Sequence, residues 1–216
     1  MTCCEVYNPP LMRKRAVKTG AVVAAMAWAL ACAGSSPDRS YGEQVLAERA
    51  DKDQFFRADP ASPLLPEDKA SFQSLPYFPV DEAYRVPASL HVATEGAGQI
   101  IQIPTSTGLV RNMVRVGFLQ FTLKGQALKL SAFGEAGARQ FDRLFVPFAD
   151  LTTGTETYAG GRYLDLDRTG SGIYDLDFNQ AYHPFCVYNP KYDCPYPPPE
   201  NRLPLPVRAG ERLPKS

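Results

Sequence analysis

Three side chains that can bind a metal or act as nucleophiles lie close together near the C-terminus, namely His183, Cys186 and Cys194. In an oxidising compartment two neighbouring cysteines commonly form a disulfide, which here would close a small loop containing Asn189 and Pro190. Imidazole and thiolate groups are also ligands for zinc or copper, but this spacing matches no standard motif and needs further ligands from elsewhere. A third interpretation places two unpaired thiols in the wall of a pocket. The disulfide is what we expect, with no bound metal or other cofactor.

The same segment is rich in hydrogen-bonding side chains. They are Asn179, Tyr182, His183, Tyr188, Asn189, Glu200 and Asn201. A coil without regular ladders can use asparagine and tyrosine side chains to satisfy its own backbone. Alternatively, these side chains form the polar floor of a pocket, where Asn and Tyr orient a small ligand and His183 exchanges a proton. All of them except Glu200 are therefore candidate ligand-binding residues.

Two arginines, Arg111 and Arg115, flank the start of a predicted strand just after the turn Thr105–Gly108. Guanidinium groups, together with turn hydroxyls and amides, can hold a carboxylate or a phosphate. The turn is not a phosphate-binding loop, because the glycine spacing and the following helix are absent. The competing interpretation pairs the arginines with acids such as Asp165 or Glu156. If the protein binds a small anion, Arg111 and Arg115 are the first candidates.

The run Asp165–Gly172 begins like a calcium loop, with alternating acids and a glycine in the sixth place. Its twelfth position is Leu176, where a calcium loop needs a bidentate acid. A hairpin turn between strands at Tyr163–Leu166 and Ile173–Phe178 explains the run better.

His91 is isolated on a predicted strand. Because no hydrolase, zinc-protease or dinucleotide motif occurs in the sequence, it favours a non-enzymatic protein.

Short strands and turns must position these residues, because 20 prolines and 16 glycines interrupt the 216-residue chain too often for long helices. The clearest pair of strands is Arg115–Lys124 with Ala127–Phe133, in which apolar and polar residues alternate. Most gaps between predicted strands are too short for helical crossovers, which favours antiparallel pairing. The further strands that we predict are Tyr84–Val86, Leu90–Ala93, Gln99–Ile103, Leu144–Phe148, Thr157–Leu166 and Ile173–Phe178.

Helices are expected at the start of the folded part, and a proline-rich coil at its end. Tyr41–Arg57 has a helical spacing of apolar residues, and Leu65–Asp68 carries a proline and acids like the first turn of a second helix. Prolines prevent regular pairing in Asn189–Pro214, whose apolar residues nevertheless make it unsuited to a free tail. We therefore predict a mainly β, single antiparallel β-sandwich or barrel-like domain with one or two N-terminal helices and a Pro-rich C-terminal coil packed on the sheet.

The first part of the chain is typical of a bacterial export signal. From Met12, which we take as the true start, a basic segment is followed by the apolar run Ala21–Ala31 and by Cys32 among small residues. The apolar run is shorter than the ~20 residues that span a bilayer, so it predicts a cleaved signal peptide. Ala29–Cys32 resembles a lipobox, in which the cysteine becomes the acylated first residue, although Ala29 stands where a larger aliphatic residue is usual. Cleavage beside an unmodified cysteine is the alternative.

We accordingly divide the chain into a signal peptide (residues 1–31), a lipid-attachment and tether segment (32–41) and a single β-rich domain (42–216). Acyl chains on Cys32 would hold the domain on a membrane, facing the periplasm or the cell surface. Nucleic acid is not an expected partner, because 23 basic and 23 acidic residues leave no net charge to attract it.

A set of motifs spread over the mature chain carries a family resemblance. They are Gln54–Pro79, Thr105–Gly108 with Arg111 and Arg115, Glu156–Tyr163, Asp177–Pro190, Cys194–Pro195, Glu200–Leu203 and Ala209–Glu211. With these motifs the chain resembles a lipoprotein-type member of a bacterial family known as domain of unknown function 1684. One departure is His183, where the family pattern has asparagine. The resemblance implies no established activity, cofactor or substrate.

Together these features favour an exported, lipid-anchored envelope protein that binds a small polar or anionic ligand. The alternative is a hydrolase-like or metal-dependent enzyme with a site around Asn179–Asn201, using His183 with Cys186 or Tyr182. The sequence leaves the identity of the ligand and the oligomeric state open.

Overall fold

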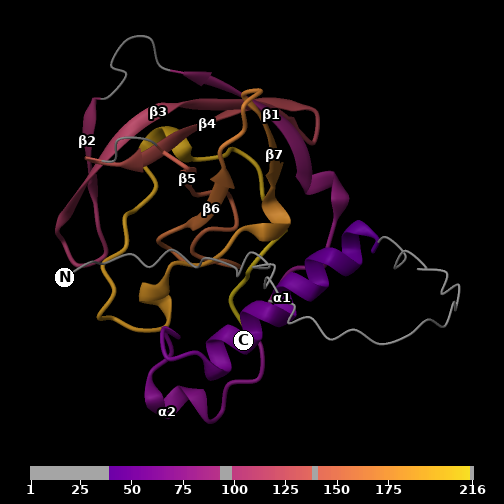
Figure 1. The fold of residues 1–216 in the computed structure, drawn as a ribbon, viewed down its shortest axis with the longest axis vertical. Helices are drawn as coiled ribbons and strands as arrows, with labels where there is room; N and C mark the ends of the chain where they lie inside the picture. The colour runs from indigo at the N-terminus through magenta and orange to yellow at the C-terminus, as the bar shows by residue number, and fades with distance from the viewer. Residues whose placement is uncertain (1–38, 93–98, 138–140, 215–216) are drawn as a thin grey trace, which may run out of the picture.

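The structure, a computed structural model, describes residues 39–92, 99–137 and 141–214. Seven strands in this part of the chain form an antiparallel sheet that curls into a nearly closed barrel (Figure 1). The strands are β1 (Arg85–Val92), β2 (Ile100–Pro104), β3 (Val110–Leu123), β4 (Gln126–Glu135), β5 (Arg143–Phe148), β6 (Arg162–Asp167) and β7 (Ile173–Asp177). Their order in the sheet is β6-β5-β4-β3-β1-β7, and β2 pairs separately with β3. The predicted mainly β, antiparallel and barrel-like fold is confirmed.

The longest strands, β3 and β4, form the hairpin that the alternating pattern predicts. Their register places Leu119 opposite Leu130, and the connecting residues Lys124 and Gly125 have φ angles of 49° and 77°. Two consecutive positive φ angles are what a two-residue hairpin turn of this kind requires. A bulge before Gly117 bends β3 where it approaches β1, and a Cβ at this glycine would lie 2.2 Å from a backbone oxygen of that strand.

Apolar side chains fill the inside of the barrel. Leu119 of β3, Leu130 of β4 and Val146 of β5 are completely buried. Leu164 of β6 and Leu176 of β7 extend the same cluster around the barrel. A functional site must therefore be sought at the surface of the barrel and beneath the segments that cover it.

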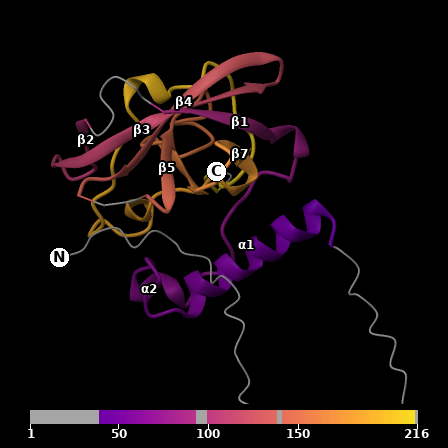
Figure 2. The same cartoon turned by 45° about the horizontal axis from the view of Figure 1, so that its top comes forward.

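Helix α1 (Tyr41–Ala58) runs beneath one end of the barrel, and the one-turn helix α2 (Pro66–Lys69) follows it (Figure 2). A capping box starts α1, because the Ser40 hydroxyl accepts from the Glu43 N–H while the Glu43 carboxylate accepts from the Ser40 N–H. Near the other end of α1, Phe56 is completely buried against aromatic residues of the C-terminal coil. Both predicted helices are present, the second as a single turn.

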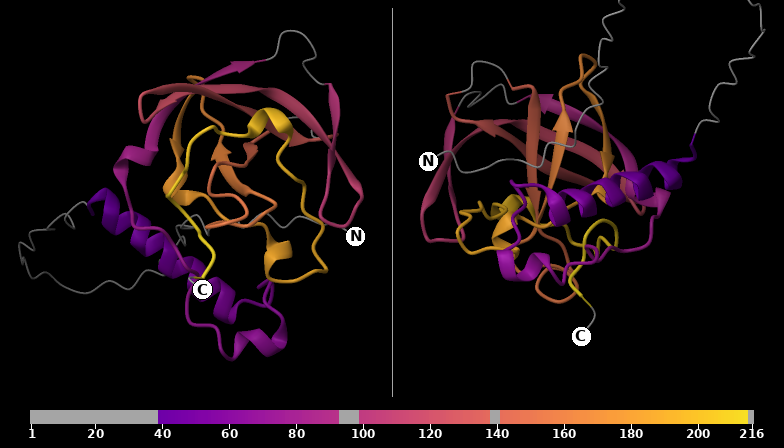
Figure 3. Two further views of the ribbon diagram at one scale, coloured as in Figure 1. Left: turned by 180° about the vertical axis from the view of Figure 1, so that it is seen from behind. Right: turned by 60° about the horizontal axis from the view of Figure 1, so that its bottom comes forward.

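The C-terminal coil crosses the barrel (Figure 3, left). Three short 3-10 helices lie along its course, η2 (Phe178–Gln180), η3 (Phe185–Val187) and η4 (Pro199–Asn201). Beyond η4, Leu203 and Val207 are buried in the core of the barrel. The prediction of a proline-rich coil packed on the sheet is confirmed.

Several strand boundaries differ from the prediction, and β3 begins at Val110, well before the predicted start at Arg115. The strands predicted at Tyr84–Val86 and Leu90–Ala93 are one continuous strand, β1. Pro87 does not divide it, because at this position β1 pairs with β7 alone, through Asp175, and the pairing with β3 begins only at Ala88. The strand predicted from Thr157 begins only with β6, because Gly161, with a φ of 82°, first turns the chain.

The predicted hairpin between Tyr163–Leu166 and Ile173–Phe178 is wrong. β6 pairs with β5 and β7 pairs with β1, so these two strands stand at opposite ends of the sheet order. Consecutive strands with a short connection usually pair with each other. Here the connection spans the incompletely closed seam of the barrel instead.

Candidate functional site

The buried asparagines of the coil bind backbone groups of other segments. Asn201 accepts from the Ser131 N–H at 2.7 Å and donates to the carbonyls of Ser131 at 2.9 Å and Pro147 at 2.7 Å. Asn179 accepts from the Asp81 N–H at 3.0 Å and donates to the Asp81 carbonyl at 2.9 Å. These contacts agree with the structural interpretation, in which side chains provide the backbone hydrogen bonds that a regular β-ladder would otherwise provide.

A buried ionic cluster joins α1 to the end of the coil. Lys52 Nζ lies 2.6 Å from Glu211 Oε1. Glu211 Oε2 accepts from the Tyr188 hydroxyl at 3.1 Å and from the His183 backbone N–H at 2.7 Å. Burial acts to raise the pKa of Glu211, but Lys52 and His183 keep it below its usual value. The carboxylate is therefore the charged centre that holds three segments together.

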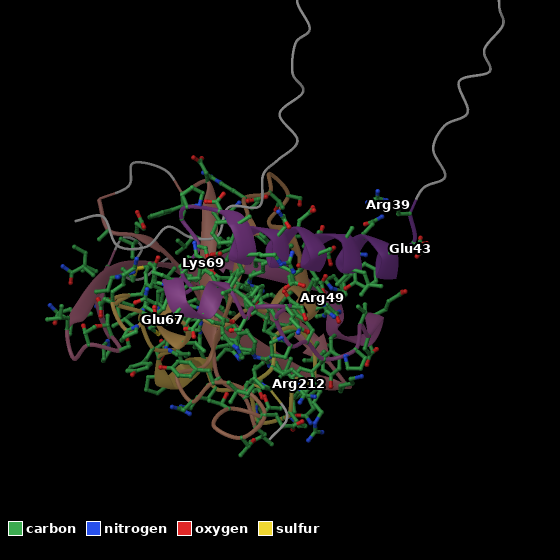
Figure 4. All side chains as sticks on the ribbon, turned by 90° about the horizontal axis from the view of Figure 1, so that it is seen from below. Arg39, Glu43, Arg49, Glu67, Lys69 and Arg212 are labelled. Carbon is green, nitrogen blue, oxygen red and sulfur yellow. The ribbon has the colours of Figure 1, made fainter. Side chains whose placement is uncertain are left out.

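Two arginines fix backbone carbonyls in the same region. Arg49 points from α1 toward the body of the protein (Figure 4) and donates to the Phe78 carbonyl at 3.0 Å. Arg162, at the start of β6, pairs with Asp150 at 2.8 Å and donates to the Val207 carbonyl at 2.7 Å. Arg162 is 1% exposed, so its charge serves to position the coil.

His183 is buried and uncharged at neutral pH. Its Nε2 accepts from the Tyr158 backbone N–H at 3.2 Å, and burial lowers the pKa of its ring to about 4. The Nε2 lone pair is thus already in use and is not available as a base for Cys186. Tyr182 donates its hydroxyl to Asp165 at 2.6 Å, and burial raises the pKa of this carboxyl to about 6. The pairs proposed for a hydrolase-like enzyme are therefore engaged in other contacts.

Cys186 and Cys194 meet beside the turn between β2 and β3. The Cys186 N–H donates to Cys194 Sγ at 3.4 Å, and Cys186 Sγ donates to the Tyr158 hydroxyl at 3.9 Å. Hydrogen bonding with Cys194 lowers the pKa of Cys186 to about 7, aided by Ser106 and Tyr158 and opposed by burial. Both residues are present as thiols, and the disulfide expected between them stays a prediction.

Metal ligands do not gather in the part of the chain that the structure describes. Within it, no group of three or more His, Cys, Asp and Glu side chains could hold an ion. In the calcium-like run Asp165–Gly172, Asp167 instead pairs with Arg143 at 2.9 Å. His91 stacks on Phe118 with ring centroids 4.9 Å apart.

Arg111 and Arg115 lie on one face of β3, on either side of the buried Met113, where the coil passes. Arg111 Nη2 donates to the Asp193 carbonyl at 2.7 Å and lies 3.5 Å from the Asp193 carboxylate. Arg115 Nη2 forms an ion pair with Glu200. Both arginines therefore already hold a carboxylate that the coil supplies.

The acidic partners predicted for these arginines, Asp165 and Glu156, are wrong. Glu156 pairs with Arg208 at 2.8 Å, and Asp165 accepts from Tyr182. Both acids come from the loop before β6 or from β6 itself, which the sheet order separates from β3 by two strands. The sequence could not show this, because the order of strands in the barrel decides which acids reach β3.

Arg115 keeps a buried donor unused, as Arg49 and Arg162 do, but of these three arginines it is the one that is partly exposed. Its Nε is buried, and no described residue accepts a hydrogen bond from it. Glu200 engages Nη2, so the Nε–Nη2 edge that can bind a carboxylate through two parallel hydrogen bonds is half occupied. In Arg85 both donors of this edge are in use, since Nε and Nη2 donate to the same oxygen, Asp175 Oδ2, at 2.8 Å and 2.6 Å.

The candidate residues therefore fall into separate groups. His183 and Tyr188 meet at Glu211, whereas Asn189 shapes the coil locally by accepting from the Lys191 N–H at 3.1 Å. The arginines on β3 form a second group, and the two thiols form a third.

Lys52, Glu211 and Tyr158 belong to these groups but were missed in the sequence. A signal for Lys52 existed, because it continues the helical stripe that contains Val45 and Phe56. A charged residue on such a stripe needs a buried partner. No comparable spacing pointed to Glu211 or Tyr158.

The predicted signal peptide, Cys32 and most of the tether lie outside the described residues. No helix within residues 39–92, 99–137 and 141–214 is long and apolar enough to cross a membrane.

The protein is thus a β-barrel protein of a particular kind. Its barrel is antiparallel and nearly closed, and the coil that crosses it carries buried polar anchors. Residues 70–212 match the family described as "Protein of unknown function (DUF1684)", and the chain belongs to that family. The chain is also similar to the uncharacterized protein from gene locus rrnAC0354 of Haloarcula marismortui, solved by solution NMR. That similarity has 40% identity and a TM-score of 0.62, and it covers 79% of this chain and 93% of the other. No curated protein matches the chain.

Proposed function

We propose that this chain is an exported, lipid-anchored envelope protein that binds a small anionic ligand at Arg115 and Arg111. The support for export and anchoring is the N-terminal sequence, in which a basic segment, the apolar run Ala21–Ala31 and Cys32 follow one another. Ser40 caps α1 a short distance after Cys32, so the tether between lipid and folded domain is short.

One observation supports the binding site above all, namely the buried Nε of Arg115 without an acceptor among the described residues. A buried donor left unsatisfied costs roughly 1–3 kcal/mol. A ligand carboxylate that lies along the Nε–Nη2 edge would satisfy this donor and form a charge-assisted pair with two hydrogen bonds. The ligand class that fits is therefore a small carboxylate or a similarly shaped oxyanion.

The two acids of the coil contribute differently to this site. Thr107 donates its hydroxyl to Asp193 at 2.6 Å, and hydrogen bonds with Thr105 and Thr107 lower the pKa of Asp193 although burial opposes them. Asp193 is thus fixed in the turn. Glu200, the middle residue of η4, has a side chain that is 36% exposed. Glu200 is therefore the group that an incoming anion displaces or shares.

A binding role fits the geometry better than the hydrolase-like alternative. That alternative needs His183 as a base next to Cys186 or Tyr182, yet His183 Nε2 accepts a backbone N–H. The Tyr182 hydroxyl is likewise committed to Asp165 at 2.6 Å.

The test is a calorimetric titration of the full chain with succinate and with inorganic phosphate, using wild type and three variants. Arg115→Gln should weaken binding about tenfold or more, equivalent to about 1.4 kcal/mol. Glu200→Gln should strengthen binding several-fold, because it removes the competing carboxylate. Arg85→Gln is the matched control and should leave affinity unchanged, since both donors of the Arg85 edge already bind Asp175.

If Arg115→Gln and Arg85→Gln lost the same amount of affinity, anion binding would depend on the overall charge and not on a site at Arg115. Weaker binding in Glu200→Gln would contradict the idea that Glu200 occupies the place of the ligand. Failure of wild type to bind either anion would also remove the proposed site.

A further inference from the structure

The two thiols are held next to each other by backbone contacts on both sides. The Cys194 N–H donates to Ser106 Oγ at 3.1 Å, and the Ser106 N–H donates to the Cys194 carbonyl at 2.9 Å. Cys186 lies in η3, where the preceding residue, Phe185, is buried in the aromatic cluster that contains Phe56. Both backbones are therefore anchored where the Cys186 N–H reaches Cys194 Sγ.

The two thiols differ in access and in acidity. Cys194 is 4% exposed, whereas Cys186 is only half-buried and can be reached from solvent. Hydrogen bonding with Cys194 lowers the pKa of Cys186 to about 7, with further contributions from Ser106 and Tyr158. At neutral pH a substantial fraction of Cys186 is thus the thiolate, which is the form that attacks disulfides.

We propose that Cys186 and Cys194 form a reversible dithiol–disulfide couple, in which Cys186 exchanges with the disulfide of a small thiol compound and Cys194 resolves the mixed product. The geometry that carries this proposal is an accessible thiol beside a buried one, with the Cys186 N–H 3.4 Å from Cys194 Sγ and the Tyr158 hydroxyl 3.9 Å from Cys186 Sγ. Thiol exchange at this couple requires no anion bound at Arg115.

The exchange proceeds in two balanced steps. The Cys186 thiolate attacks one sulfur of the small disulfide, so that a Cys186–sulfur bond forms, the sulfur–sulfur bond breaks and one thiolate leaves. Cys194 then loses its proton and attacks Cys186 Sγ, which forms the internal disulfide and expels the second thiolate. The protein dithiol is oxidised by two electrons, the small disulfide is reduced to two thiols, and those thiols take up the two protons that the protein releases.

The reverse reaction is favoured by the same surroundings. In reverse, a small thiolate attacks the accessible Cys186 Sγ and expels the Cys194 thiolate. A second small thiolate then releases Cys186, whose low pKa makes it a good leaving group in this last step. The Tyr158 hydroxyl can donate to the sulfur of Cys186 as charge develops there. This distinguishes an exchanging couple from an inert structural disulfide.

The proposal can be tested in the full chain with Cys3, Cys4 and Cys32 replaced by serine, so that only these two thiols react. The reduced protein is mixed with glutathione disulfide, and adducts are followed by mass spectrometry. The unaltered pair should release two glutathiones and end as the internal disulfide. Cys194→Ser should accumulate a mixed disulfide on Cys186, whereas Cys186→Ser should react at least tenfold more slowly, because Cys194 is buried.

Site-resolved alkylation from pH 5 to pH 9 provides a second readout. The rate at Cys186 should have its midpoint near pH 7, and Tyr158→Phe should raise that midpoint without unfolding the protein, as checked by circular dichroism. A midpoint for Cys186 above pH 8, or equal rates at both cysteines, would overturn the proposal. A stable glutathione adduct on the unaltered pair would do so as well, since Cys194 would then not act on Cys186.

Discussion

At the scale of single residues, the candidate ligand-binding side chains differ in how completely their hydrogen bonds are satisfied. Asn201 has backbone partners on both its oxygen and its nitrogen, and it is completely buried. Arg115, by contrast, keeps a buried donor without a described acceptor. Arg49 and Arg162 also keep a buried Nε without an acceptor, but both are buried, so the partly exposed Arg115 is the one that can recognise a ligand.

His183 should make the stability of the protein depend on pH on the acid side of neutrality. Burial lowers the pKa of the His183 ring in the folded state to about 4 from 6.5. Between these pH values the unfolded chain binds a proton at His183 that the folded chain does not bind. Stability from this group is therefore complete above pH 6.5 and is lost as the pH falls toward 4, by about 3 kcal/mol in total. His183→Asn should remove this loss, because asparagine does not titrate. Urea unfolding of both proteins at pH 7 and pH 4 measures the difference.

The titration of Asp165 changes the stability in the opposite direction, so its effect must be measured separately from that of His183. Burial raises the pKa of Asp165 to about 6 from 3.8, so the folded state binds this proton more readily than the unfolded state. The buried charged carboxylate destabilises the fold at neutral pH, and this destabilisation is relieved as the pH falls from 6 to 3.8. Wild type should thus lose less stability in acid than Asp165→Asn, in which the effect of His183 is no longer offset by Asp165. If His183→Asn and wild type lost the same stability between pH 7 and pH 4, the buried neutral state of His183 would be wrong.

At the scale of elements, the β3–β4 hairpin depends on its turn. Gly125 has a φ of 77°, and a Cβ there would meet no atom within 4 Å, so Gly125→Ala introduces backbone strain alone. It should cost about 1 kcal/mol of unfolding free energy. Gly42→Ala is the control, because Gly42 lies in α1 with equally open space, and the substitution should be neutral or stabilising. Thermal or urea unfolding of both variants checks this, and an equal response of the two glycines would contradict the turn geometry.

The elements that the sequence revealed are those whose patterns are local. The alternation in Arg115–Lys124 predicted β3, and the helical spacing after Ser40 predicted α1 to within a residue or two. The pairing of β6 and β7 was missed, because a short Gly and Ser turn does not tell which edges of a barrel are joined. Closure of the sheet is a property of all seven described strands together.

The candidate site was predictable to a similar extent. The sequence identified Arg115 and the two cysteines by residue type, since their chemistry is visible without a fold. It could not identify Glu200 or Tyr158 as their partners, because these contacts join positions far apart in the chain. The burial of His183 was also hidden, and burial is what sets its pKa.

At the scale of the whole molecule, the proposed arrangement is a barrel tethered close to a membrane. The residues between Cys32 and the cap of α1 at Ser40 span at most roughly 30 Å when extended. Two sites would then face the same compartment, the anion site at Arg115 and the thiol couple at Cys186. Export fits the thiol couple, because an oxidising compartment supplies disulfides for exchange.

The central claim is that the protein is exported and anchored to a membrane by lipid on Cys32. Its most direct test is fractionation of cells that express wild type or Cys32→Ser and are fed labelled palmitate. We expect wild type to begin at Cys32, carry the label and sediment with membranes, while Cys32→Ser loses the label and leaves the membrane fraction. Cys186→Ser is the matched control and should keep both the label and the membrane location. An unprocessed, unlabelled wild-type chain that retains Arg13 and Lys14 in the soluble cell interior would contradict the claim.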